Sequence, residues 1–170
     1  TGVENTLMAA ALIPGTTTIR FASANYMVQD LCVFLESMGV HIDGIGTANL
    51  VVHGIDRIDM DAVGEPSEDP IEAMFFTALA ATTGSEITVR RAPIDFVGLE
   101  LMRLKKMGLR FTTTEPVVGE NGRVRLVDIK VMPSALIASD EKIAPMPYPG
   151  LNIDNLPLFV PIATQAEGKT

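Results

Sequence analysis

The chain contains no tryptophan, one cysteine and two histidines among its 170 residues. One cysteine cannot form a disulfide framework, and it cannot supply a cysteine-based zinc site. The longest apolar runs, such as residues 7–13, fall far below the roughly 18 residues that a membrane-spanning helix needs. These scarcities argue against a disulfide-rich secreted domain and a membrane protein, so we expect a protein of the reducing cytoplasm with no membrane partner.

Basic residues are also in the minority. Thirteen Lys and Arg stand against 21 Asp and Glu, which gives a formal net charge of -8. A protein that binds nucleic acid usually carries a basic surface, so we expect no nucleic-acid partner. The chain is 47% hydrophobic and 20% charged, which is the composition of a globular protein.

A pattern of glycine, strand and helix occurs twice in the chain. In each copy a glycine precedes an alternating, β-branched run that predicts a strand. Apolar residues at helical spacing follow, and they end at a Met-Gly pair where glycine suits a left-handed helix cap. The two glycines of the first copy are as far apart as those of the second. The copies comprise Gly15, residues 16–20, residues 27–38 and Gly39, and then Gly84, residues 85–90, residues 96–107 and Gly108.

A helix-start signal precedes each of these copies and occurs once more near the C-terminus. Thr1 opens one capping box, Asp69 opens another, and Asp154 stands before the apolar residues 156–165. An oxygen at such a position accepts hydrogen bonds from the free N–H groups of the first turn. We therefore expect Asp154 to cap a helix as Asp69 does.

These signals divide the chain into a first repeat unit at 1–66, a second at 67–146, and a connection with the start of a third unit at 147–170. Each complete unit is predicted to be helix–strand–helix–strand–strand, and Asn121-Gly122 is typical of a hairpin turn in the second. The predicted fold class is α/β, with helices packed on sheets.

The most apolar helices, at 7–13 and 75–81, are expected to be buried on most sides. The third unit stops just after its glycine. We expect an unfinished unit to expose apolar helix surface, and self-association through that surface is a reasonable prediction.

For the other candidate functional residues, the sequence favours structural roles over functional ones. Cys32 lies in an apolar helix and is interpreted as core. His41 and His53 have no neighbouring His or Cys in sequence, so strand-surface or hydrogen-bonded core positions are favoured over metal ligation. The glycines at 44–47 join two strands, which favours a hairpin over a dinucleotide loop. Asp154 keeps two interpretations, a helix cap or a carboxylate at the rim of a substrate cleft.

With these patterns in place, residues 1–11 resemble a segment of UDP-N-acetylglucosamine 1-carboxyvinyltransferases that begins roughly Gly-Ala-Thr-Glu-Asn. The resemblance covers nearly the whole chain and is weaker at 55–66 and 110–145. Its order and spacing are more specific than any single motif. Further similar positions are Gly15-Thr16-Thr17, Asp30, Phe34-Leu35, Met38-Gly39, Gly46-Thr47, Asp69, Ile71-Glu72, Pro147-Tyr148-Pro149-Gly150, Asp154 and Ala166-Glu167-Gly168.

The resemblance implies the enolpyruvyl-transferase fold, an inside-out α/β barrel of repeated helix–strand–helix–strand–strand units, here incomplete. It also implies a transferase that moves enolpyruvyl from phosphoenolpyruvate to the 3-hydroxyl of UDP-N-acetylglucosamine in peptidoglycan (cell wall) precursor synthesis. Phosphate is released, and neither a metal nor an organic cofactor is implied.

Four residues receive site assignments from the resemblance. Asp154 is similar to the family aspartate that contacts the sugar hydroxyl and removes its proton, so it is expected to be both catalytic and substrate-binding. Thr1, Gly2 and Val3 would follow the loop that approaches the uridine nucleotide, and they are expected to bind substrate.

The chain also departs from the family pattern. Ile153 stands where a threonine is usual, and Pro70 stands where an arginine is usual. The family's Lys-Asn pair, its loop cysteine and its anion-binding arginines have no counterpart, so the chain alone is not expected to turn over. The alternatives are a diverged non-catalytic scaffold or interaction domain of the same fold, and an enolpyruvyl transferase of the shikimate branch.

Overall fold

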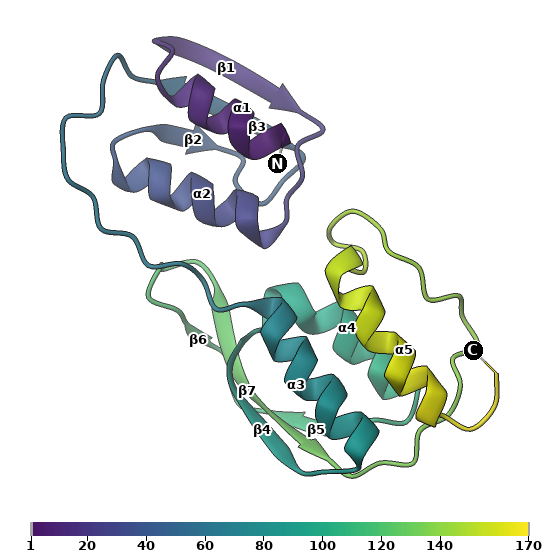
Figure 1. Ribbon diagram of the computed structural model, residues 1–170. Helices are drawn as coiled ribbons and strands as arrows, with labels where there is room; N and C mark the ends of the chain where they lie inside the picture. Colours follow the sequence, from purple (N-terminus) through teal and green to yellow (C-terminus); the bar gives the residue numbers. More distant parts are fainter. Residues whose placement is uncertain (1, 170) are drawn as a thin grey trace. The chain divides into compact units, whose positions relative to one another are not determined.

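The chain folds as two units, Thr1–Pro66 and Ser67–Thr170, and the computed structural model describes residues 2–169 (Figure 1). Thr1, which the sequence predicts to open a capping box, lies outside the described residues. Each unit combines an antiparallel sheet with helices that cover its apolar face. Between residues 2 and 169, no helix has both the length and the apolar character that crossing a membrane requires.

In the first unit, the last strand occupies the centre of the sheet. The strand order is β1-β3-β2, and β3 is antiparallel to both neighbours. Gly44 and Gly46 adopt positive φ angles in the turn between β2 and β3, which confirms a hairpin rather than a dinucleotide loop. The elements are α1 (Gly2–Ala11), β1 (Gly15–Arg20), α2 (Tyr26–Ser37), β2 (His41–Asp43) and β3 (Asn49–Gly54).

The second unit repeats this arrangement. Its strand order is β4-β7-β5, again with the last strand in the centre, and the short strand β6 also pairs with β7. The predicted Asn121-Gly122 turn joins β6 to β7. The elements are α3 (Pro70–Thr83), β4 (Ile87–Pro93), α4 (Ile94–Lys106), β5 (Arg110–Thr113), β6 (Val117–Val118), β7 (Arg125–Met132), the 3-10 helix η1 (Ile153–Asn155) and α5 (Leu156–Gln165).

The equivalent glycines that end α2 and α4 adopt the same backbone conformation. Gly39 has a φ of 91° and Gly108 has a φ of 92°, which is the left-handed region that glycine enters without a Cβ penalty. At Gly108 a Cβ would also lie 2.7 Å from the carbonyl oxygen of Ala135. The repeat predicted from glycine spacing therefore corresponds to two copies of one supersecondary unit.

The prediction that the apolar helices are buried on most sides is wrong. In α1, Leu7 and Ala10 are buried on the sheet, whereas Met8 is half exposed. In α3, Phe75 is 48% exposed and Leu79 is 40% exposed. Each helix packs on one layer of strands, so part of its surface stays exposed to solvent. Helical periodicity alone does not show how many layers surround a helix.

The two acids at helix starts differ in what they do. The Asp69 carboxylate caps α3 and accepts the N–H of Ile71 at 2.7 Å, as predicted. Asp154 does not cap α5, which corrects the sequence prediction. It lies inside η1, and its own N–H donates to the side-chain oxygen of Asn152 at 3.0 Å. Asn152 is therefore the cap of η1, whereas α5 begins after Asn155 without a side-chain cap.

We predict that Asp69→Ala lowers the free energy of unfolding by about 1 kcal/mol, because the first turn of α3 loses its side-chain acceptor. Asp154→Ala is the matched variant and should change the free energy of unfolding by less than about 0.5 kcal/mol, because no helix cap is lost. Urea denaturation followed by circular dichroism measures both. Equal destabilisation by the two variants would contradict the assignment of Asn152 as the cap.

Candidate functional site

The segment Pro147–Asp154 makes a tight turn before η1. The N–H of Gly150 donates to the carbonyl of Pro147 at 2.7 Å, and the N–H of Met146 donates to the carbonyl of Leu151 at 3.0 Å. A Cβ at position 150 would lie 2.4 Å from the Cβ of Met146, so only glycine fits this turn without displacement. Leu151 is buried in the core of the second unit, which anchors the far end of the turn.

Tyr148 attaches this turn to the start of α4. Its ring lies against the ring of Phe96, with centroids 5.6 Å apart, and its hydroxyl donates to the carbonyl of Asp95 at 3.4 Å. Burial raises the pKa of the Tyr148 hydroxyl above its ordinary value of 10.0, since the phenolate would be poorly solvated there. Tyr148 therefore stays neutral and can donate its proton throughout the physiological range.

Glu100 on α4 provides the second attachment, from inside the core. Its side chain is 2% exposed. One carboxylate oxygen accepts the Nδ2–H of Asn155 at 3.0 Å and the N–H of Asn152 at 3.3 Å. A buried carboxylate is costly unless it is hydrogen-bonded, so these donors satisfy Glu100 while Glu100 fixes both asparagines.

Asp154 lies between the two asparagines that Glu100 holds. Its residue is exposed, and within residues 2–169 no hydrogen bond or ion pair of its carboxylate is found. Glu100 fixes the asparagines on either side, whereas the Asp154 residue itself is exposed to solvent. This arrangement suits a group that accepts a proton from an external molecule, because the oxygen atoms are accessible and their position is constrained.

The other residues assigned from the resemblance lie in the first unit. Gly2 and Val3 form the first turn of α1, and Thr1 is outside the described residues. Gly2 is exposed with open space at its Cβ position, whereas Val3 packs against the core of its unit. Their assignment as substrate-binding residues stays a prediction.

A cleft of the second unit with a volume of about 500 Å³ lies between the start of α3 and strand β4. Two adjacent arginines, Arg90 and Arg91, line this cleft. The Nε of Arg91 donates to a carboxylate oxygen of Glu68 at 2.8 Å. The Nε of Arg90 lies 3.8 Å from a carboxylate oxygen of Asp128. These carboxylates offset the arginine charges, so the cleft is not a ready-made phosphate site. A smaller cleft of about 430 Å³ lies between the C-terminal ends of α3 and α5.

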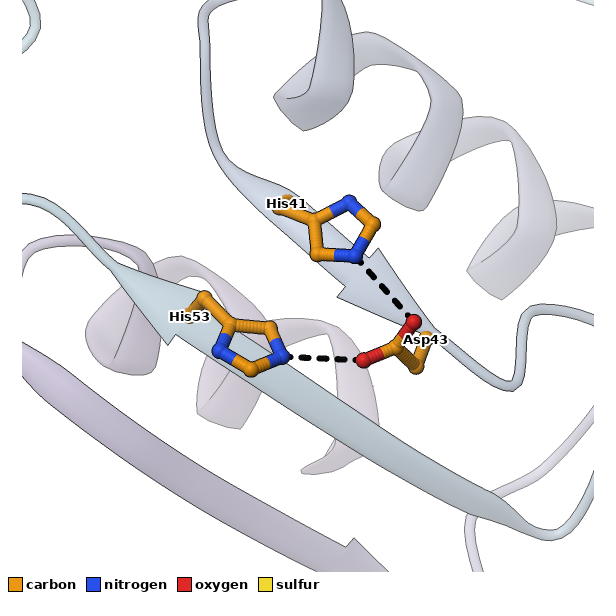
Figure 2. Close-up of side chains that lie close together, drawn as sticks. All are labelled: His41, Asp43 and His53. Carbon is orange, nitrogen blue, oxygen red and sulfur yellow. Dashed lines mark hydrogen bonds and ion pairs between the residues drawn. The ribbon is translucent and has the colours of Figure 1, made fainter.

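Sequence reasoning missed a cluster of titratable side chains in the first unit. Figure 2 shows His41, Asp43 and His53 pointing toward one another on β2 and β3. The hydrogen bond from His53 is the main cause that lowers the pKa of Asp43 below its ordinary value of 3.8. The structure confirms the predicted strand-surface positions of His41 and His53. The sequence interpretation had compared each histidine only with its neighbours in the chain. The signal that could have found the cluster is the cross-strand register of the predicted hairpin. Cys32 is buried, which confirms its interpretation as core.

Comparison with known proteins identifies a family over the full length of the chain. Residues 1–170 match the family described as EPSP synthase (3-phosphoshikimate 1-carboxyvinyltransferase). The chain is 35% identical over 172 residues to the UDP-N-acetylglucosamine 1-carboxyvinyltransferase of Thermobifida fusca, covering 100% of this chain and 37% of that protein. It is 36% identical over 169 residues to the protein of the same name from Sulfurimonas denitrificans, covering 99% of this chain and 37% of that protein.

Solved structures show the same fold. The enolpyruvyl transferase NikO from Streptomyces tendae matches with a TM-score of 0.71 at 20% identity, covering 98% of this chain and 37% of that one. EPSP synthase from Acinetobacter baumannii matches with a TM-score of 0.61 at 22% identity, covering 95% of this chain and 35% of that one. The expected enolpyruvyl-transferase fold is confirmed, and the chain spans little more than a third of the length of these relatives.

We predict that Glu100→Ala destabilises the second unit by about 1–3 kcal/mol, because it leaves the buried donors of Asn152 and Asn155 without an acceptor. Glu100→Gln is the matched control, since its side-chain oxygen can still accept from both donors. Urea unfolding and the hydrogen exchange of the Asn152 amide measure the effect. Wild-type stability and protection in Glu100→Ala would show that Glu100 does not hold the Asp154 segment.

Proposed function

Since the chain belongs to the EPSP synthase family, we propose that it contributes to an enolpyruvyl transferase acting on UDP-N-acetylglucosamine. The sequence likeness to proteins of that name, 33% to 36% across nearly the whole chain, is the observation that supports this acceptor. The proposed reaction transfers enolpyruvyl from phosphoenolpyruvate to the sugar 3-hydroxyl, as a step toward peptidoglycan. With one cysteine, which is buried, the chain suits the reducing cytoplasm, where we place this activity.

Asp154 is the proposed general base. The acceptor oxygen forms a bond to C2 of phosphoenolpyruvate while C3 gains a proton, and loss of phosphate and a C3 proton then restores the double bond. Asp154 takes the hydroxyl proton as the oxygen attacks. Its exposed carboxylate and the anchored asparagines beside it support this role, since a base must lie within hydrogen-bond distance of the proton it removes.

We infer that the charges needed at the phosphate-bearing centre come from outside this chain. Its basic pair on β4 is already matched by carboxylates. Stabilising the developing charge is usually a large part of such catalysis. We therefore propose that the 170-residue chain does not turn over by itself and contributes the base to a larger site.

The alternative function is a non-catalytic scaffold or interaction domain of the same fold. Ile153, next to the proposed base, is 65% exposed and apolar where the resembling family usually has threonine. Loss of a polar neighbour beside a base favours divergence of the acceptor or loss of catalysis. A shikimate-branch acceptor is the other alternative.

We predict that the full-length gene product releases phosphate from phosphoenolpyruvate with UDP-N-acetylglucosamine and not with shikimate 3-phosphate. Asp154→Asn should lower kcat by at least about 100-fold, because the general base is lost. Asp140→Asn, at an exposed acid between β7 and η1, is the control and should retain activity. A phosphate-release assay with each acceptor measures this, and the isolated chain should give no release.

Preference for shikimate 3-phosphate would overturn the proposed acceptor, whereas full activity of Asp154→Asn would overturn the proposed base. Phosphate release by the isolated chain would contradict the incomplete site. Absence of phosphate release with either acceptor, together with retained folding, would instead support the scaffold.

Self-association also stays a prediction, and exposed apolar residues of α3 support it. Phe75, Phe76 and Leu79 are all partly exposed on this helix. We expect sedimentation velocity to show that the chain associates as its concentration rises. Leu79→Lys should weaken this association, because the lysine charge would be buried in the contact between two chains. Met102→Lys, at an exposed apolar position of α4, is the control. A monomer at all concentrations would contradict the prediction.

A further inference from the structure

The His–Asp cluster (His41, Asp43 and His53) is built by strand register. His41 on β2 lies directly opposite His53 on β3, and Asp43 follows His41 by two residues on the same strand. Side chains two residues apart share a face, so all three project from the face opposite the core. The intervening Ile42 and Val52 are buried beneath them. Main-chain pairing therefore fixes the three Cα positions independently of any ligand.

The cluster is close enough to enclose one ion. The carboxylate oxygens of Asp43 lie 3.1 Å from Nε2 of His41 and 2.9 Å from Nε2 of His53 (Figure 2). The two rings stack with centroids 5.1 Å apart. One candidate ligand atom from each residue lies within 4.8 Å of those from the other two. A tetrahedral zinc with bonds of about 2.0–2.1 Å needs ligand atoms about 3.3 Å apart, which small side-chain rotations can reach.

We propose that His41, Asp43 and His53 form a binding site for a divalent transition-metal ion of the zinc type. Two imidazoles and one carboxylate are the donor set that zinc accepts, and three protein ligands leave a coordination position for water. The hard ions Mg²⁺ and Ca²⁺ prefer all-oxygen sites, so the two nitrogen donors disfavour them. Cys32, the one cysteine of the chain, is buried and does not compete.

The hydrogen bonds of the cluster can be exchanged for metal coordination. An ionised carboxylate only accepts hydrogen bonds, so in the metal-free chain each ring donates to Asp43 from a protonated Nε2. A metal bound through Nε2 takes the place of this proton, which moves to Nδ1 through water or leaves the ring. Three coordinate bonds then replace two hydrogen bonds. The net charge of -8 also favours cation binding.

A metal at this position would join β2 to β3. The strand β2 is only three residues long and lies at an edge of its sheet, so it has few main-chain bonds of its own. A ligand that binds only the folded state stabilises it by mass action. The site would therefore stabilise the sheet of the first unit, and it is separate from the Asp154 chemistry assigned to the second unit.

The test is a titration of the tag-free 170-residue chain with zinc chloride by isothermal calorimetry. We expect one saturable site per chain. His41→Gln and His53→Gln should each weaken binding by at least about tenfold, and Asp43→Asn should also weaken it, because each removes a ligand. Asp61→Asn, at an exposed acid elsewhere in the first unit, is the matched control and should bind as the wild type does.

Cobalt(II) gives a second measurement that does not depend on affinity alone. Ligation by two imidazoles at low coordination number should produce visible absorption bands that zinc abolishes. The bands should be absent in His41→Gln, while circular dichroism shows that this variant remains folded. Wild-type binding by the folded histidine variants, or no saturable zinc binding by the wild type, would overturn the proposal.

Discussion

Both units depend on a strand that comes last in their sequence and lies at the centre of their sheet. β3 and β7 supply the main-chain partners for all the strands beside them. Their inward side chains, among them Val52, Ile129 and Val131, are fully buried under the helices. Since side chains alternate along a strand, a shift of one residue would turn these side chains to solvent. The register of the central strand therefore fixes where the helices pack and where the following segment starts.

The proposed catalytic chemistry uses this framework through α4. The helix holds Glu100 inside the core, and Glu100 accepts the backbone N–H of Asn152 and the side-chain Nδ2–H of Asn155, the asparagines on either side of Asp154. The proposed base is thus positioned by a residue more than fifty positions away in sequence and is not itself part of the hydrophobic packing. The basic residues Arg90 and Arg91 serve ion pairs within the unit. A proposed base beside arginines that already have carboxylate partners is what one wall of a larger site would contribute.

Local patterns in the sequence were enough to predict the two repeat units. Glycine spacing, β-branched runs and the Asp69 cap depend on residues close together in the chain, so the elements could be assigned without a structure. Asp154 was predicted to cap because its position resembled that of Asp69, but Asn152 competes for the role two residues earlier. The Glu100 anchor and the His41–His53 pair depend on contacts across elements. Their detection requires the helix packing or the strand register, which no local pattern contains.

The edge strand β2 has a further consequence for the behaviour of the first unit in solution. An exposed strand edge can pair with the edge of another molecule and begin aggregation. β2 is three residues long and presents His41 and Asp43 outward, so it offers few free main-chain groups and a polar surface. Short length and charge are both features that discourage such pairing. The same side chains that are proposed to bind a metal therefore protect the sheet from intermolecular strand addition when the metal is absent.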